Sequence, residues 1–99
     1  MVYTVTDEKE LRQVSAIFSA LGSPTRLKIV ELISETEGPL HIKAVAQVLK
    51  KDYAAVYRHI RVLEKCGLVG VYDVGRSRVI YLKNAEQVKE CVRTVQKML

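Results

Sequence analysis

The sequence contains few of the residues that build catalytic or metal sites. It has two cysteines and two histidines among 99 residues, and Cys66 and Cys91 are too far apart for a zinc cluster or a disulfide framework. The HExxH, GxSxG and phosphate-loop motifs are missing, and the scattered acids define no site with the histidines. We therefore expect no enzymatic activity, no cofactor and no metal.

Long apolar runs are also absent. No segment approaches the roughly 20 apolar residues that cross a bilayer, and the first ten residues are too acidic for a signal peptide. These features predict a cytoplasmic protein without a membrane partner. In a reducing cytosol, the two cysteines are expected to behave as small apolar residues.

The composition is that of one globular domain. Apolar residues make up 48% of the chain and charged residues 27%, which excludes a disordered tail. A chain of this length buries only about 60–65% of its unfolded surface, so a monomer would have a thin core. We expect residues 1–99 to form a single domain that gains further burial from a partner.

Positive charge is concentrated in the middle of the sequence. Residues 38–83 hold nine Lys or Arg against three acids, a net charge of +6, whereas residues 1–37 hold four against six. Such a cationic region is typical of a surface that faces a polyanion. The charge alone leaves nucleic acid and an anionic membrane surface open.

Two helices are predicted in the first third of the chain. Thr6 is the expected N-cap of the first, which spans residues 7–21 and ends at Gly22. Ser23 and Pro24 then provide the N-cap and the first residue of a second, central helix.

A helix-turn-helix is predicted at about residues 43–66. Its first helix covers residues 43–50, and its second covers residues 53–66, with Asp52 as the cap and Gly67 as the stop. The second helix is basic on one side. Its other side is an apolar stripe that consists of Val56, Ile60 and Leu63.

A β-hairpin and a last helix complete the pattern. Apolar alternation with a period of two predicts strands at residues 68–72 and 79–82 around a polar tip. Asn84 and Gln87 resemble a capping box for a helix over residues 85–99. The order of elements predicts a mainly α fold with a β-hairpin (α+β), namely a winged helix-turn-helix.

The second helix of the helix-turn-helix has the properties of a DNA recognition helix. An α-helix fits the major groove, and an arginine fork suits a guanine edge or a phosphate. We expect this helix to contact DNA through Tyr53, Ala54, Tyr57, Arg58 and Arg61. The wing, about residues 68–82, would add Arg76, Ser77 and Arg78. Further phosphate contacts would come from Lys43, Lys50 and Lys51.

Three segments resemble the ArsR family of regulators. The run LGSPTRLKI at residues 21–29 is similar to that family's L-(A/G)-x-(P/E)-(T/V)-R-L-x-I signature. The run VYRHIRVLEKCGLV at residues 56–69 resembles its recognition helix, and GRSRVIYL at residues 75–82 resembles its wing. The match covers nearly all of residues 15–83. It implies a winged-helix homodimer that binds a palindromic operator, usually as a repressor.

Members of that family often sense metals, and here the sequence departs from the pattern. Metal-responsive members often carry E-L-C-V-C-D-L before the turn, whereas residues 39–45 are PLHIKAV, with His41 and Lys43 where the thiolates would lie. A lysine ammonium is no metal ligand at neutral pH, and one histidine cannot complete a tetrahedral site. Residues 84–99 contain no histidine, and their two glutamates are expected to form a solvated face. We predict no metal sensing.

Two single residues are ambiguous. His59 lies at the position of the family's recognition-helix histidine, where it either contacts a phosphate or packs at the helix edge. Cys66 is expected to be a small core residue rather than a redox sensor, because no neighbour in the sequence would activate its thiol.

The terminal helices, at about residues 7–21 and 85–99, predict a homodimer interface. The last helix repeats apolar residues at intervals of three and four and has more apolar surface than one domain needs. The alternative is that it packs back onto its own domain. A dimer axis near Cys91 would allow an intersubunit disulfide. The expected interface residues are Leu11, Val14, Phe18, Val88, Cys91, Val92, Val95 and Leu99.

These observations lead to one leading hypothesis and two alternatives. We expect a homodimeric winged-helix regulator that binds double-stranded DNA in a sequence-specific manner, usually to repress. The alternatives are an architectural protein that binds DNA without sequence preference and a winged helix used for protein assembly. Retention of the basic face argues against protein assembly, and discrimination between sequences separates a regulator from an architectural protein.

Overall fold

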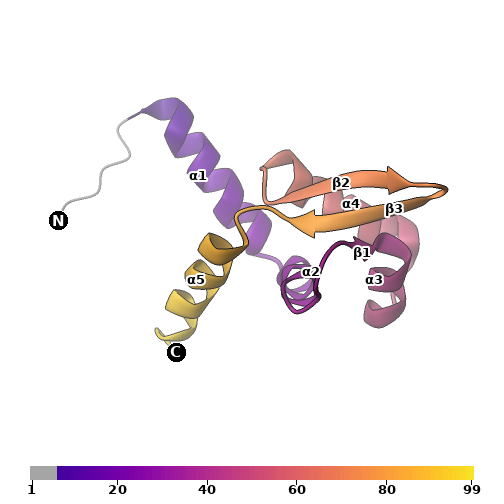
Figure 1. Ribbon diagram of the computed structural model, residues 1–99. Coiled ribbons are helices and arrows are strands. Elements are labelled where there is room, and N and C mark those ends of the chain that lie inside the picture. The colour runs from indigo at the N-terminus through magenta and orange to yellow at the C-terminus, as the bar shows by residue number, and fades with distance from the viewer. Residues whose placement is uncertain (1–6) are drawn as a thin grey trace.

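The computed structural model describes residues 7–99 as five helices and a three-stranded antiparallel sheet (Figure 1). This arrangement confirms the winged helix-turn-helix fold expected from the sequence. In chain order the elements are α1 (Glu8–Leu21), α2 (Pro24–Ser34), β1 (Leu40–His41), α3 (Ile42–Leu49), α4 (Tyr53–Lys65), β2 (Val69–Val74), β3 (Ser77–Leu82) and α5 (Ala85–Gln96).

The first two helices begin at side-chain caps. The Ser23 hydroxyl accepts a hydrogen bond from the Arg26 N–H at 3.3 Å, and Pro24 is the first residue of α2, as predicted. Helix α1 also begins at a side-chain cap, but one residue later than expected. Its N-cap is Asp7, whose carboxylate accepts from the Lys9 N–H at 2.9 Å. The expected cap, Thr6, lies outside the described residues.

Two other predicted N-caps lie at the expected positions but make no side-chain capping hydrogen bond. Asp52 occupies the N-cap position of α4, but its side chain makes no capping hydrogen bond. Asn84 precedes α5 in a left-handed conformation with φ +51, also without a side-chain cap. The residue turns the chain from β3 into α5 instead of closing a capping box. Helix α5 ends at Gln96, three residues before the expected end.

The sheet has the strand order β1-β3-β2, and β2 and β3 form the wing. Their pairing extends from Val69 opposite Leu82 to Val74 opposite Ser77, so only Gly75 and Arg76 remain in the turn. The tip is therefore shorter than the expected tip, which consists of residues 73–77. Gly75 has φ +60, and a glycine at the first position of a two-residue hairpin turn supplies the required left-handed backbone.

The Tyr81 ring lies across Gly70 on the opposite strand. A Cβ atom at Gly70 would collide with that ring, so a side chain there would force the ring aside. The ring also contacts Tyr72, with centroids 5.8 Å apart and planes tilted by 56°. Cross-strand packing of this kind fixes the register of the hairpin.

One apolar core joins the helix-turn-helix to the sheet. It contains residues of α2, α3, α4 and the strands, and the expected inner stripe of α4 is completely buried. The largest fully buried side chains are Ile29, Ile42, Ile60, Leu63, Ile80, Val45, Val56 and Val69.

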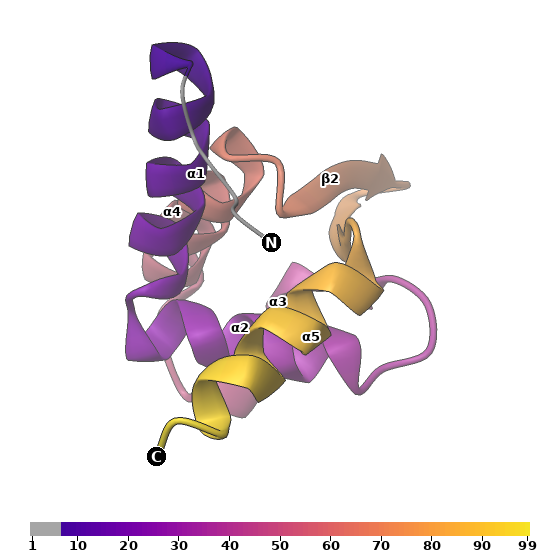
Figure 2. The same cartoon turned by 90° about the vertical axis from the view of Figure 1, so that its left-hand side faces the viewer.

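Helices α1 and α5 lie at the end of the molecule opposite the wing tip (Figure 1). The molecule is elongated, with extents of 47 × 30 × 22 Å. Figure 2, viewed from the end that carries these helices, shows α1 projecting from the domain and α5 crossing below it. Ala20 is the buried residue of α1, and Val88 is that of α5. Most of the surface of both helices is therefore uncovered.

Candidate nucleic-acid interface

The turn between α3 and α4 depends on a residue in the left-handed conformation. Lys50, directly after α3, has φ +55 and ψ 43. The N–H groups of Lys50 and Lys51 donate to the carbonyls of Gln47 and Ala46 at 3.2 and 3.1 Å, which closes the end of α3. Glycine usually occupies such a position, because a left-handed side chain costs about 1–2 kcal/mol. Lys50 thus keeps a charge where the backbone favours glycine.

Helix α4 has one buried and one exposed side. Three apolar side chains face the core, and six other residues of the helix are exposed, among them Val62 and Lys65. We call the other four the outer face of α4; they are Tyr53, Ala54, Arg58 and Arg61. All four were expected to contact DNA. The fifth expected residue, Tyr57, is half-buried at the margin of this face.

Tyr57 connects α4 to the wing. Its ring stacks on that of Tyr53, with centroids 6.2 Å apart and planes at 12°. The guanidinium of Arg78, on β3, lies 5.0 Å from the Tyr57 ring centroid, and that of Arg61 lies 6.0 Å from it. A hydrogen bond with Tyr57, together with the charge of Glu64, raises the pKa of Arg61. Tyr57, Arg61 and Arg78 thus form a contact between helix and wing, which we call the Tyr57 junction.

The arginines of this region differ in their ionic partners. Arg61 Nε lies 3.7 Å from a carboxylate oxygen of Glu64, and Arg78 Nε lies 3.5 Å from one of Asp73. Arg58 has no carboxylate oxygen within 4.0 Å in residues 7–99. Its guanidinium therefore has no competing carboxylate.

Further exposed cations lie in the elements next to α4 in the sequence and in the wing. They belong to α3, to the turn before α4 and to the wing tip, and all are exposed. Within the part of the chain that the structure describes, none of them has a carboxylate oxygen within 4.0 Å. These residues, all expected phosphate or wing contacts, are Lys43, Lys50, Lys51 and Arg76. Ser77, the remaining expected wing residue, is exposed at the start of β3.

His59 packs against α2 at the edge of α4. Its Nδ1 lies 3.1 Å from Nη1 of Arg26. A guanidinium only donates, so Nδ1 must accept, which requires the neutral imidazole. Burial, followed by the positive charges of Arg26, Lys51 and Arg58, lowers the pKa of His59 and favours that neutral form. Of the two interpretations from the sequence, packing at the helix edge accounts for this geometry.

Arg26 is a candidate residue that sequence reasoning missed. It lies in the first turn of α2, where a cation is unfavourable with the helix dipole. An arginine at such a position indicates a specific partner elsewhere. The sequence carries this signal but does not reveal the partner, which lies 33 positions away at His59.

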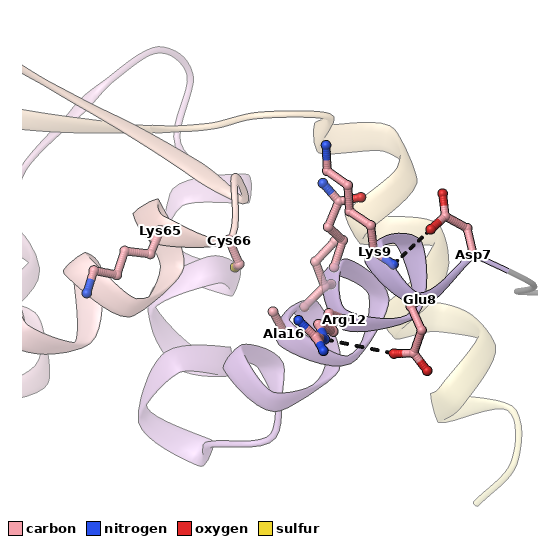
Figure 3. Close-up of a pocket in the computed structure, with 9 residues that line it drawn as sticks. Asp7, Glu8, Lys9, Arg12, Ala16, Lys65 and Cys66 are labelled. Atoms are coloured by element: carbon pink, nitrogen blue, oxygen red, sulfur yellow. Dashed lines mark hydrogen bonds and ion pairs between the residues drawn. The ribbon is translucent and has the colours of Figure 1, made fainter.

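Cys66 lies beside an open pocket of about 850 Å³ between α1 and the end of α4 (Figure 3). Its half-buried thiol donates to the Leu63 carbonyl at 3.4 Å. Charged side chains of α1 line the other side, including Arg12 and Glu8, which lie 3.9 Å apart. This setting agrees with Cys66 as a small residue packed at the end of α4.

Six of the eight residues expected at a dimer interface line a groove of about 760 Å³ between α1, α2 and α5, whereas Leu11 and Val14 lie outside it. Phe18 and Val95, which line it, are 60% and 50% exposed. Val88 differs from the expectation, because at 6% exposure it belongs to the core of its own domain. The other expected residues are exposed or half-buried: Leu11, Val14, Cys91, Val92 and Leu99.

The described residues contain neither a metal-binding cluster nor a membrane-spanning helix. In residues 7–99, no group of three or more His, Cys, Asp or Glu side chains is placed to hold a metal ion. Among the helices in that range, none has the length and apolar character needed to cross a membrane. Cys66 and Cys91 are both free thiols.

Comparison with known proteins identifies the family. The HVO_A0114 family matches residues 21–88, which is more than half of the chain. The chain belongs to this family. The matched segment includes α2, the helix-turn-helix and the wing.

Curated relatives of this chain are named as transcriptional regulators. The uncharacterized HTH-type transcriptional regulator MJ1325 of Methanocaldococcus jannaschii is 29% identical over 91% of this chain and 99% of its own length. The cadmium resistance transcriptional regulatory protein CadC homolog of Staphylococcus aureus is 33% identical over 80% of this chain. The alignment spans 64% of that CadC homolog. These relatives confirm the resemblance to ArsR-like regulators.

Solved structures share the fold. The homodimeric winged helix-turn-helix DNA-binding domain Mb0332 from Mycobacterium bovis superimposes with a TM-score of 0.82. The match covers 98% of this chain and 90% of that domain, at 19% identity. At this level of identity the likeness establishes the fold of this chain alone.

The left-handed Lys50 predicts a stabilising substitution. Lys50→Gly should raise the free energy of unfolding by about 1 kcal/mol, because glycine adopts φ +55 without steric cost. Urea denaturation followed by circular dichroism measures this change. Lys51→Gly is the matched control, since the neighbouring lysine has no positive φ and should gain nothing. Equal effects of the two substitutions would contradict the assigned strain.

Proposed function

We propose that this protein is a sequence-specific regulator of transcription that binds double-stranded DNA as a homodimer. The observation that carries this proposal is the outer face of α4, where Arg58 has no carboxylate partner, together with the exposed cations of the turn and wing. In this proposal α4 enters the major groove and the wing lies along the adjacent backbone. The names of the helix-turn-helix relatives support the same function.

Within the outer face, Arg58 is the proposed base reader. Its guanidinium has no competing carboxylate, so both of its outer nitrogens can approach the O6 and N7 atoms of a guanine. Tyr53 and Ala54, at the N-terminal end of α4, provide hydroxyl and apolar contacts to neighbouring positions. The N-terminal residues of a recognition helix are those that reach base edges.

The Tyr57 junction is the proposed phosphate contact. Arg61 and Arg78 each have an acidic partner and a position beside the same aromatic ring, which holds them close to the α4–wing boundary. A pair of guanidiniums at that boundary suits a backbone phosphate between the two DNA-contacting elements. Of the two acceptors left open by the sequence, a guanine edge or a phosphate, this proposal assigns the phosphate to Arg61. Lys43, Lys50 and Lys51 supply additional phosphate contacts.

The proposed homodimer forms through α1 and α5. Phe18 and Val95 are exposed at the groove between these helices, and burial of such side chains stabilises an interface. The solved domain Mb0332, which shares the fold, is described as homodimeric. A two-fold dimer places two copies of α4 on one side of the assembly, as binding to half-sites one helical turn apart requires.

Repression without metal control is the remaining part of the proposal. A dimer that covers two half-sites excludes other proteins from that DNA. His41 and Lys43 are both exposed at the start of α3. A lysine ammonium there cannot act as a metal ligand, so this segment offers no thiolate pair to Cd²⁺ or Zn²⁺.

The role of Arg58 predicts a loss of specificity. On a duplex selected by the protein from a random pool, Arg58→Ala should weaken binding by about 1–3 kcal/mol, with a much smaller effect on random duplex. Arg61→Ala and Arg78→Ala should weaken binding to both duplexes by a similar factor, because a phosphate contact carries no sequence information. Fluorescence anisotropy titrations at several salt concentrations measure both effects.

Arg12→Ala is the charge-matched control for these variants. Arg12 is an exposed arginine on α1, far from the wing tip, and its removal should leave both affinities unchanged. If Arg58→Ala weakened binding to both duplexes equally, Arg58 would be a phosphate contact and not a base reader.

The interface predicts that an acidic substitution dissociates the dimer. Phe18→Glu should give a monomer in sedimentation equilibrium, because the dimer would have to bury the new carboxylate in an apolar contact. The monomer should be little disturbed, because Phe18 is exposed on its surface. Val48→Glu, at an equally exposed valine of α3, should leave the dimer intact. A wild-type monomer, or a dimer in both variants, would refute this interface.

Repression and its independence of metal predict one pattern in transcription assays. Transcription in vitro from a promoter that carries the selected duplex should fall when the protein is added. The transcript level should remain low when Cd²⁺ or Zn²⁺ is added in excess, because residues 39–45 hold no thiolates. Recovery of transcription by either metal would show that the protein is metal-responsive, and an increase on adding protein would show an activator.

A further inference from the structure

The Arg26 guanidinium joins three helices. Its Nε donates to the Ala20 carbonyl at 2.7 Å, and its Nη2 donates to the Ser19 carbonyl at 3.4 Å, both in α1. Its Nη1 donates to Nδ1 of His59, in α4, at 3.1 Å. Arg26 itself belongs to the first turn of α2 and is half-buried. One planar group therefore fixes α1, α2 and α4 relative to one another.

The two carbonyls belong to the last turn of α1. Carbonyl groups at a helix C-terminus lack intrahelical donors and carry a partial negative charge, so a cation is favoured there. The Ser19 carbonyl also accepts from the Gly22 N–H at 3.2 Å. Arg26 thus holds the end of α1 beside the start of α2, across the short connection at Gly22 and Ser23.

The contact with His59 is directional, unlike the packing around it. Apolar contacts between α1 and α4 are non-directional and tolerate small rotations. Hydrogen bonds weaken steeply when their angle departs from linearity. The planar guanidinium must satisfy acceptors on both helices at once. A rotation of α4 relative to α1 would therefore break at least one of these bonds.

We propose that Arg26 is a positioning residue, which sets the angle of the recognition helix relative to α1 and thereby the half-site spacing that the dimer accepts. The inference rests on the proposed function, in which α1 forms the dimer interface and α4 reads DNA. In a two-fold dimer, any rotation of α4 moves the two recognition helices in opposite directions. An error in one subunit is therefore doubled across the site. His59 is the acceptor through which Arg26 acts on α4.

The test compares variants that break this link in different ways. Arg26→Lys keeps the positive charge but loses the planar fork. His59→Leu removes the acceptor, whereas His59→Asn keeps one at the position of Nδ1. The probes are the duplex selected by the wild-type protein and versions with the half-sites one or two base pairs closer or farther apart. Each base pair changes the separation by about 3.4 Å.

The expected result is a change in spacing preference. The wild-type protein should prefer one spacing by about tenfold or more, since a displaced helix loses base contacts. Arg26→Lys and His59→Leu should accept several spacings with affinities within about threefold of one another. His59→Asn should restore the preference. Affinity for random duplex should be the same in all variants, because the phosphate contacts remain.

A purely structural role for Arg26 gives a different result. Loss of folding would lower affinity for every duplex and would not change the preferred spacing, and circular dichroism detects it independently. Variants that retain the wild-type spacing preference would overturn this inference alone. A wild-type protein that binds all duplexes equally would overturn the proposed function and the inference with it.

Discussion

Burial of one side of α4 is the interaction on which the rest of the structure depends. Val56, Ile60 and Leu63 are fully buried in the core that joins α2, α3 and the sheet. Burial of such side chains contributes about 1.5–3 kcal/mol each, a large share of the stability of a small domain. Because a helix has about 3.6 residues per turn, this inner stripe forces Arg58 and Arg61 outward. The surface proposed to contact DNA is thus a direct consequence of core packing.

Polar contacts then fix the orientation of α4 relative to α1 and the wing, which core packing alone does not determine. The core fixes which side of α4 faces outward, but the Arg26 hydrogen bonds and the Tyr57 junction tie the helix to α1 and to the wing. These contacts lie at opposite edges of α4, so helix and wing behave as one unit that is anchored to the proposed dimer helix. Lys50 keeps a positive charge in a left-handed turn position, where the backbone conformation has an energetic cost.

The sequence predicts the fold well wherever one residue type determines local structure. Ser23 and Pro24 start α2, Gly67 follows the end of α4, and the period of apolar residues identifies the inner stripe. Prediction fails where a residue has two local options, as at Asn84, which adopts a left-handed conformation instead of capping α5.

The site is predicted less completely than the fold. The exposure of Ala54, Arg58 and Arg61 follows from the helical period, because each lies opposite the apolar stripe. The partners of Arg26 and Arg78 do not, since His59 and Tyr57 are brought to them by tertiary packing across long intervals of sequence. The outcome for Val88 has the same cause: only the packing of α5 against its own domain distinguishes a core residue from an interface residue. The central claim, sequence-specific DNA binding, is tested most directly by titrating the wild-type protein with its selected duplex and with random duplex of equal length across a range of salt concentrations. We predict a preference of about a thousandfold or more for the selected duplex; equal affinity for both duplexes, or binding to neither, would contradict the claim.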